Sequence, residues 1–373
     1  MVLWTDTMPL LIYNDCSDTI WPGIYTASGT GPGTGGFELA AGANVSLEVS
    51  TNWDGRIWGR TNCTSTGDDV LTCTTGSCGQ MDCTQASVSD LSSLHPRDVG
   101  VLLGDIRGQP PATLAEITLA GGTNGTQNFV DISLVDGYNL PLALEYQADP
   151  SGQQPPPNLV NPACIATAGY LSPRSRTGTQ YYTNSSYPMP YETAQTSQRV
   201  GHWCPWGLQA LDPPKPGAGV YPYPDDEAAR PAFDPCLSAC KATGSARDCC
   251  TGGYDDPGRC PRSLYSRRAK AVCPDAYSFP YDDADSTFVI PGGGGWAVRF
   301  CPAGRSTDIL ATFGAQISEW AASGVLSDDV LAAAGNVSYI DAKGAAAGGP
   351  GAGGYLGRVL GAAVVALVVN VML

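Results

Sequence analysis

Short runs of alternating apolar and polar residues recur along the chain and predict β-strands more often than helices. Residues 9–52 contain several such runs, separated by glycine-rich turns such as GTGPGTGG. Residues 98–148 contain four more, and STFVI and GWAVRF follow shortly before Cys301. Because alternate side chains of a strand point to opposite faces of a sheet, each run indicates a strand with one buried face. The pattern predicts a mainly β fold of antiparallel strands.

Three stretches lack this alternation and predict loops or disulfide-stapled regions. Residues 53–84 are rich in cysteine, glycine and threonine and predict a small, locally stapled region. Residues 149–235 are rich in proline, tyrosine, serine and glutamine, which is typical of long surface loops. Cysteines crowd between Cys236 and Cys273, where apolar residues are too few for an independent core. We expect disulfides to hold that last region together.

Beyond residue 302 the apolar positions change to the period of a helix. They are Ile309, Phe313, Ile317 and Trp320. Residues three or four apart share one face of a helix, so a short helix is predicted, with Thr307 and Asp308 as capping residues at its start. The apolar face either packs on a core or forms an adhesive patch. We interpret residues 303–354 as a flexible stalk that contains this helix.

Two aspartates interrupt the apolar run DISLVDGYNLPL of residues 131–142. Asp131 and Asp136 are five residues apart, so an unbroken strand would point them to opposite faces. The dipeptide Asp136-Gly137 is also a turn signal. Either the two are unrelated surface acids, or the chain bends and brings both carboxylates to one site.

The acidity of the chain narrows the classes of partner. Its 373 residues carry a formal net charge of -15, with 43% apolar and 15% charged residues. Like charge repels nucleic acids and anionic lipids, so we expect neither as a main partner. Neutral sugar polymers and cationic groups remain compatible with this charge.

Fourteen cysteines and five Asn-x-Ser/Thr sequons indicate an oxidising, extracellular compartment. The sequons begin at Asn44, Asn62, Asn124, Asn184 and Asn336, and we expect glycosylation there. The alternative use of so many cysteines is metal binding. The chain has no Cys-x-x-Cys pair, and His95 and His202 are its only histidines, so we expect disulfides, no metal site and no cofactor.

The C-terminal tail predicts membrane attachment through a lipid. Small residues at 344–349 are followed by a spacer and by fifteen uncharged residues after Arg358. That run is short for a spanning helix, and the tail 355–373 is typical of a glycosylphosphatidylinositol (GPI) signal. A tail-anchored helix and a vacuolar sorting tail are the alternatives. The first 16 residues lack the order of a secretory leader, so we expect a leader that the recorded start omits or that has been removed.

Nine stretches, in order from residue 10 to residue 302, resemble the thaumatin-like proteins of plants. They are NDCSDTIWPGI, GFELAAG, GRIWGRTNC, TGSCGQMDC, TLAEITL, DISLVDGYNLPL, ACKATGSARDCC, VCPDAYSFPYDDADSTF and VRFCP. The resemblance implies a flattened antiparallel β-sandwich with a disulfide-rich domain of loops and helices and a small disulfide-stapled hairpin domain. The implied boundaries are 9–302 for the whole domain, 9–52, 85–163 and 274–302 for the sandwich core, 53–84 for the stapled region and 164–273 for the Cys-rich domain. The segments 165–203 and 210–235 depart from the family's pattern.

The resemblance also implies a disulfide map. The implied pairs are Cys16–Cys301, Cys63–Cys73, Cys78–Cys83, Cys164–Cys273, Cys204–Cys236, Cys240–Cys249 and Cys250–Cys260. The family typically has sixteen cysteines in eight bridges, so one bridge is missing here. Ile290 stands where one of the missing cysteines belongs, and its partner belongs in PPPNLVNPAC, just before Cys164. The loss of both members of one bridge leaves no cysteine over.

A set of charged residues is implied to line a cleft between the sandwich and the Cys-rich domain. Matched by motif, the set is Arg56, Glu116, Asp131, Asp136 and Asp282, with Asp283 as the alternative to Asp282. On this interpretation Asp131 and Asp136 converge, with the bend at Asp136-Gly137. Crowded carboxylates raise at least one pKa, and an arginine offsets part of the charge. Tyr138, Tyr277 and Phe279 are candidates either for stacking on sugar rings or for core packing.

Two functions follow from the resemblance. The first is a cell-surface or cell-wall defence protein, expected to be a monomer, that binds β-1,3-glucan. The second is an endo-β-1,3-glucanase in which Glu116 acts as the acid together with Asp136, because glycoside hydrolysis needs a proton donor beside an ionised carboxylate. Permeabilisation of fungal membranes suits an acidic, anchored protein least.

Overall fold

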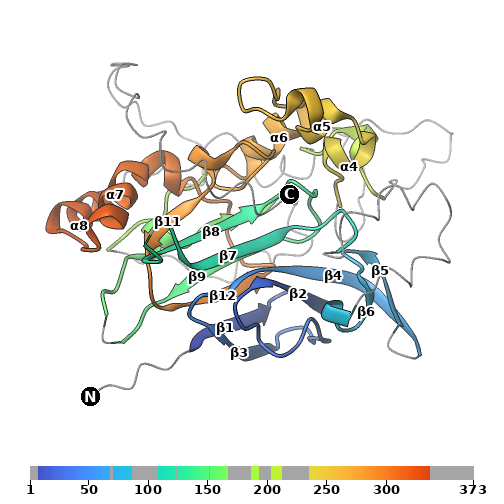
Figure 1. Cartoon of the computed structure of the whole chain (residues 1–373), viewed down its shortest axis with the longest axis horizontal. Coiled ribbons are helices and arrows are strands. Elements are labelled where there is room, and N and C mark those ends of the chain that lie inside the picture. Colours follow the sequence, from blue (N-terminus) through green and yellow to red (C-terminus); the bar gives the residue numbers. More distant parts are fainter. Residues whose placement is uncertain are drawn as a thin grey trace. The chain divides into compact units, whose positions relative to one another are not determined.

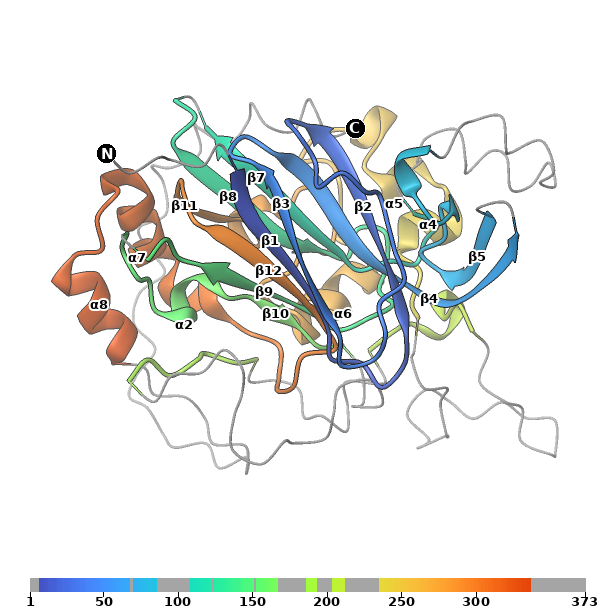
Figure 2. The ribbon, with the colours of Figure 1, turned by 90° about the horizontal axis from the view of Figure 1, so that it is seen from below.

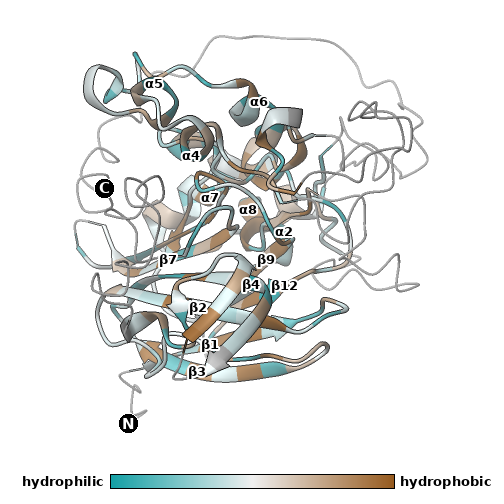
Figure 3. Ribbon diagram, turned by 90° about the vertical axis from the view of Figure 1, so that its right-hand side faces the viewer, coloured by the Kyte–Doolittle hydropathy of each residue, from teal (hydrophilic) through white to brown (hydrophobic). Residues whose placement is uncertain are grey.

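Two β-sheets packed face to face form the body of the protein, which is described here from a computed structural model. The structure describes residues 7–67, 70–85, 108–122, 124–150, 152–166, 186–192, 203–211 and 235–336. Both sheets consist mostly of antiparallel pairs, and hydrophobic and hydrophilic residues alternate along their strands (Figure 3). The mainly β prediction is therefore confirmed.

The first sheet has five strands in the order β10-β9-β12-β1-β3, seen side by side in Figure 2. The strands are β1 (Thr7–Asn14), β3 (Asn44–Ser50), β9 (Leu142–Gln147), β10 (Ala163–Cys164) and β12 (Gly295–Phe300). One pair departs from the predicted antiparallel arrangement: β1 runs parallel to β12, with Leu10 opposite Trp296. Because β1 and β12 are far apart in sequence, no short hairpin constrains their direction.

The second sheet follows the order β11-β8-β7-β4-β5-β6, and β2 also pairs with β4. Its strands are β2 (Ile20–Ser28), β4 (Asp54–Gly67), β5 (Val70–Thr75), β6 (Gly79–Gln80), β7 (Leu114–Gly121), β8 (Gln127–Ser133) and β11 (Phe288–Pro291). The stapled region predicted over 53–84 differs from expectation. Its first part is the long strand β4, which belongs to the main sheet and only then continues into the β5 hairpin.

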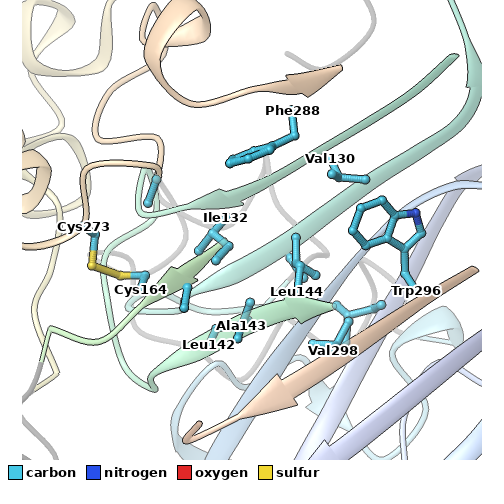
Figure 4. Close-up of a cluster of buried hydrophobic side chains, with 14 of the residues drawn as sticks. Val130, Ile132, Leu142, Ala143, Leu144, Cys164, Cys273, Phe288, Trp296 and Val298 are labelled. Atoms are coloured by element: carbon cyan, nitrogen blue, oxygen red, sulfur yellow. A yellow bond between two sulfur atoms is a disulfide. The ribbon is translucent and has the colours of Figure 1, made fainter. Parts of the chain in front are cut away.

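The core lies between the two sheets (Figure 4). The β8 residues Val130 and Ile132 are buried, as are Leu144 and Val298 of the other sheet. Phe288 of β11 and the Cys164–Cys273 disulfide belong to the same cluster. Burial of apolar side chains from both inner faces is the main stabilising term of such a sandwich.

The Cys-rich helices lie on the side of the second sheet that faces away from the first (Figure 1). They are α4 (Ala239–Thr243), α5 (Ala246–Cys249) and α6 (Leu264–Val272), each preceded by a serine whose side chain accepts a hydrogen bond from the first turn. Such capping satisfies amide groups that short helices leave unpaired. Short elements elsewhere are α2 (Pro157–Val160) and the 3₁₀ turns η1 (Cys83–Gln85), η3 (Trp206–Leu208), η4 (Gly252–Tyr254) and η5 (Asp283–Asp285).

Seven disulfides are present, and they join the same pairs that the resemblance implied. They are Cys16–Cys301, Cys63–Cys73, Cys78–Cys83, Cys164–Cys273, Cys204–Cys236, Cys240–Cys249 and Cys250–Cys260. No cysteine is left free. Three of these bridges lie wholly within residues 240–273 or tie that region to the sandwich, as expected for a region with few apolar residues.

The stalk predicted from residue 303 does not begin there. The predicted helix exists as α7 (Ile309–Ser323), and a second helix, α8 (Asp328–Gly335), follows. The apolar face of α7 is buried in the main core, so core packing, and not an adhesive patch, describes it. The cap also differs from the prediction, because Asp275 and not Asp308 accepts hydrogen bonds from the amides of Ile309 (2.8 Å) and Leu310 (2.9 Å).

Several predictions lie wholly or partly outside the described residues. They concern the strand VGVLLGDI, most of the segments 165–203 and 210–235, the sequon at Asn184, residues 337–354 of the predicted stalk and the GPI signal at 355–373. The other four sequon asparagines, Asn44, Asn62, Asn124 and Asn336, are exposed. Within the described ranges, none of the helices has both the length and the apolar character needed to cross a membrane.

Candidate functional site

A row of polar side chains crosses the second sheet where three strands are in register. Arg56 of β4 lies opposite Glu116 of β7, and Glu116 lies opposite Asp131 of β8. Directly opposed residues on neighbouring strands project from the same face, with Cβ atoms about 5 Å apart. Three residues far apart in sequence are therefore brought together by strand register alone.

This row faces away from the core. The neighbouring positions Ile57, Ala115 and Ile132 are also in register with one another, and each is at most 1% exposed. Because successive side chains of a strand point to opposite faces, the adjacent residues Arg56, Glu116 and Asp131 point to the other face of the sheet. That outer face is the side on which α4, α5 and α6 lie (Figure 1).

Arg56 and Glu116 form a close ion pair. The Arg56 Nε atom is 2.5 Å from Glu116 Oε1, and each side chain is 15% exposed. Asp131 forms a hydrogen bond with Glu116 on the other side. Glu116 thus lies between a cation and a second carboxyl group.

The two neighbouring carboxyl groups share a proton. Burial raises the pKa of Asp131 well above its usual range, and the charge of Glu116 raises it further. Burial also raises the pKa of Glu116, but Arg56 and the hydrogen bond with Asp131 act in the opposite direction. These shifts favour Asp131 over Glu116 as the carrier of a shared proton, as expected when like charges are crowded in a buried site.

Asp136 joins this group through a bend after β8. The strand ends at Ser133, and Gly137 follows with a φ of 104°, where a Cβ atom would lie 2.4 Å from the carbonyl oxygen of Cys236. Glycine is therefore required at this turn. The charge of Asp136 contributes to the raised pKa of Glu116, which places the two carboxylates near each other. The chain therefore bends after β8, and Asp131 and Asp136 are not two unrelated surface acids.

Asp136 is also paired with a cation from the Cys-rich helices. Lys241 of α4 places its Nζ atom 3.0 Å from Asp136 Oδ1, with the two side chains 21% and 13% exposed. No feature of the stretch ACKATGSARDCC distinguishes Lys241 from an ordinary surface lysine. The sequence does not predict its pairing with Asp136, because that contact depends on how α4 lies against the sheet.

Asp282 and Asp283 have different roles, although they are adjacent. Asp282 is fully buried between two cations, at 2.9 Å from Arg262 and 3.3 Å from Lys270. It also accepts hydrogen bonds from the amide and hydroxyl groups of Ser278, which marks it as a structural anchor for this loop.

Asp283, the alternative match, lies toward the row. Its charge contributes to the raised pKa of Asp131, and its carboxylate accepts a 2.7 Å hydrogen bond from the hydroxyl of Tyr277. The Tyr277 hydroxyl is also 2.5 Å from the side-chain oxygen of Thr287. Tyr277, whose backbone pairs with Ser133 of β8, thus connects that strand with the loop before β11.

The three candidate aromatic residues separate in the same way. Tyr138 is fully buried and packs edge-on against Trp203 at 5.7 Å, so it is a core residue. Phe279 lies under the guanidinium of Arg262 at 5.2 Å. Tyr277 is partly exposed, and its hydroxyl donates a hydrogen bond to Asp283.

The charges of the site nearly balance. Arg56 is paired with Glu116, Lys241 is paired with Asp136, and Asp131 holds a proton. Such a surface offers hydrogen-bond donors and acceptors without a large net charge, which suits a ligand rich in hydroxyl groups. Among the described residues, no cluster of histidine, cysteine or acidic side chains is arranged to hold a metal ion.

The chain is similar in sequence to known proteins. A family model described as Thaumatin family matches residues 14–96 and 103–302. Thaumatin-like protein 1 of Pyrus pyrifolia is 33% identical over 293 residues, which is 78% of this chain and 88% of the relative. A protein of Prunus avium named glucan endo-1,3-beta-glucosidase is 32% identical over 292 residues, again 78% of this chain and 88% of the relative.

Among solved structures, the thaumatin-like xylanase inhibitor TLXI matches 37% of this chain and 75% of its own, with 26% sequence identity and a TM-score of 0.27. The family model alone spans well over half of the sequence. The chain belongs to the thaumatin family.

Proposed function

We propose that this protein binds β-1,3-glucan, a neutral polysaccharide, through the outer face of the second sheet. The binding residues are Arg56, Glu116, Asp131 and Asp136, joined by Asp283 in place of Asp282. Glucan hydroxyls donate to carboxylates and accept from guanidinium and ammonium groups, and the row together with Asp136 and Lys241 supplies each of these groups.

The register of Arg56, Glu116 and Asp131 across three strands is the observation that carries the proposal. A strand surface is rigid, so the three side chains form a preorganised set and lose little freedom on binding. Glu116 and Asp136 are each paired with a cation. A neutral ligand therefore fits the site better than a strongly charged one. The relative named glucan endo-1,3-beta-glucosidase points to the same class of ligand.

Binding of laminari-oligosaccharides by the full chain tests this proposal. Glu116→Gln keeps the shape of the side chain but removes the charge, so affinity should fall by about 1.5–3 kcal/mol if a charged hydrogen bond is lost. Glu48→Gln is the matched control, because Glu48 is an exposed residue of β3 in the other sheet. Isothermal titration calorimetry measures both. Equal affinity of wild type and Glu116→Gln would contradict the proposal.

Hydrolysis of the same glucan is the second candidate function. In this reaction the proton shared with Asp131 passes to Glu116, whose raised pKa suits a general acid that must hold a proton near the working pH. Its partner is Asp136, because Asp131 is hydrogen-bonded to Glu116 and so lies closer than the roughly 5–5.5 Å that separates the carboxyl groups of a retaining glycosidase. Release of reducing ends from soluble β-1,3-glucan tests this. Activity that persists in Glu116→Gln would rule out the assignment.

We also infer an extracellular site of action with a lipid anchor. Seven disulfides suit an oxidising compartment, and the apolar C-terminal sequence suits a GPI signal. A defence protein at the plant cell surface or wall would meet β-1,3-glucan there, and a single copy suffices for the site. Treatment of membranes with phosphatidylinositol-specific phospholipase C should release the protein. Release by detergent alone would instead indicate a spanning tail.

A further inference from the structure

Lys241 is held in a fixed position beside the row. It lies in α4, where its amide donates to the side chain of Ser238, the residue that caps the helix. The Cys240–Cys249 disulfide fixes the neighbouring residue to α5. Its ammonium group is 3.0 Å from Asp136 and only 21% exposed. The cation is therefore a built part of the site and not a mobile surface charge.

Several charged or titratable groups surround the Asp136 carboxylate. Glu116 is close enough for its pKa to be raised by Asp136, and Arg56 and Asp131 lie beyond Glu116 in the same row. Burial, with a further contribution from the charge of Asp136, raises the pKa of Tyr265 of α6, whose hydroxyl donates to the carbonyl of Leu134. Lys241 is the cation that pairs with Asp136 directly.

We propose that Lys241 determines the ligand preference of the row, restricting it to neutral saccharides by occupying Asp136. This inference rests on the proposed glucan-binding function of the same residues. With Lys241 in place, a cationic sugar meets a carboxylate that is already paired. Without it, Asp136 becomes an uncompensated, partly buried carboxylate that an amino sugar can neutralise.

A purely structural role for Lys241 is a distinct alternative. The backbone already clamps the turn beside Asp136 onto the Cys-rich segment, because Tyr138 and Cys236 exchange two hydrogen bonds of 2.8 Å. Gly137 has no side chain, so the two backbone segments can approach this closely. Loss of the Lys241 ammonium therefore leaves the turn in place and changes mainly the charge of the site.

The test compares Lys241→Met with wild type in the full chain. The probes are laminari-oligosaccharides, which are neutral, and chitosan oligosaccharides, which are cationic. The ratio of the two affinities should shift toward the cationic probe by about tenfold or more, the size expected when one charged contact is gained. Arg268→Met is the matched control, because Arg268 is an exposed residue of α6, and it should leave the ratio unchanged.

A readout independent of ligand separates this inference from the proposed function. The pKa of Glu116, followed by carbon-13 NMR, should rise in Lys241→Met, because the charge of Asp136 is no longer offset. In the double variant Lys241→Met with Asp136→Asn, both the pKa of Glu116 and the preference for neutral sugars should return toward wild type. This variant also remains informative if the single variant folds poorly.

The outcomes are distinguishable. Wild-type protein that binds neither probe overturns the glucan proposal and with it the preference. Wild-type protein that binds the neutral probe, with Lys241→Met giving the same affinity ratio and the same pKa of Glu116, overturns the role of Lys241 alone. A proportional loss of both affinities assigns Lys241 a structural role and also overturns the inference.

Discussion

At the scale of residues, burial and the neighbouring charge of Glu116 both raise the pKa of Asp131 and so favour its protonated form. A carboxyl group whose pKa is raised by folding binds a proton more tightly in the folded chain than in the unfolded chain. The stability that it contributes is therefore present at low pH and is lost as the pH rises through the folded pKa.

Asp131→Asn should remove this pH dependence. The asparagine amide can still donate to Glu116 but never becomes charged, so the melting temperature should match wild type near pH 4 and exceed it at pH 8. Calorimetric melting at both values measures the difference. Asp18→Asn, at an exposed carboxylate outside the site, is the control and should show no such gain. A variant that is less stable than wild type at pH 8 would assign the proton elsewhere.

Individual residues also mark where sequence reasoning reaches its limit. Arg56 and Glu116 could be proposed only from the family resemblance, which also implied that Asp131 and Asp136 converge at a bend. Choosing between Asp282 and Asp283 requires knowing which carboxylate meets Arg262 and Lys270, and that depends on the packing of α6. Neighbouring residues in a loop point in different directions that no pattern of residue types encodes.

At the scale of elements, α7 connects the two segments that the family's missing eighth disulfide would join. The resemblance places that bridge between Ile290, now in β11, and the stretch that forms α2. Helix α7 packs against both β11 and α2. Ile290 and Leu159 of α2 are fully buried in the same core cluster as Phe313 of α7. Apolar packing by α7 therefore joins the two segments that the implied eighth bridge would connect.

Phe313→Ala should consequently destabilise the whole domain and not only the helix. The side chain is 3% exposed, so its loss leaves a cavity and should lower the free energy of unfolding by about 3–5 kcal/mol. Ser318→Ala on the exposed side of α7 is the control and should change it by less than about 0.5 kcal/mol. Urea unfolding gives both values. A small loss at Phe313 would mean that α7 adds little to the body of the protein.

The apolar period after residue 308 predicted α7 correctly, but the assignment of this helix to a flexible stalk was wrong. Helical spacing shows that one face is apolar and says nothing of what covers that face. The surface that covers it consists of β11 and α2. Two glutamine side chains add hydrogen bonds: Gln127 donates to the carbonyl of Ala321, and Gln153 accepts from Trp320 and Leu326. These contacts join residues far apart in sequence, which a local pattern does not reveal.

At the scale of the whole molecule, the two ends of the family domain close on each other. Strand β1 pairs in parallel with β12, and Cys16, just after β1, is bridged to Cys301, just after β12. The cysteine pairs could be stated before the structure only because of the family resemblance, since composition and spacing leave many connectivities open. The parallel direction of β1 and β12 could not be read from either strand alone.

This closure predicts unequal effects of removing two disulfides. Cys16 and Cys301 are 285 residues apart, whereas Cys63 and Cys73 of the β4–β5 hairpin are 10 apart. A bridge restricts the unfolded chain more when its loop is longer, although Cys164–Cys273, which spans 109 residues, shortens the larger ring. On this account the Cys16→Ser and Cys301→Ser double variant should lose about 2–3 kcal/mol more stability than the Cys63→Ser and Cys73→Ser double variant.

Urea unfolding without reductant compares the two double variants with wild type. Each double variant removes both cysteines of one bridge, so the remaining twelve cysteines can still form their six bridges. Alkylation should therefore label no thiol in either variant, which checks that the other bridges are intact. Equal losses in the two variants, or a larger loss in the hairpin variant, would mean that local strand pairing, and not closure of the long ring, dominates the contribution of these bridges. The larger loss in the Cys16 and Cys301 variant is expected because it frees β1, and β1 holds both β12 and β3 in the first sheet.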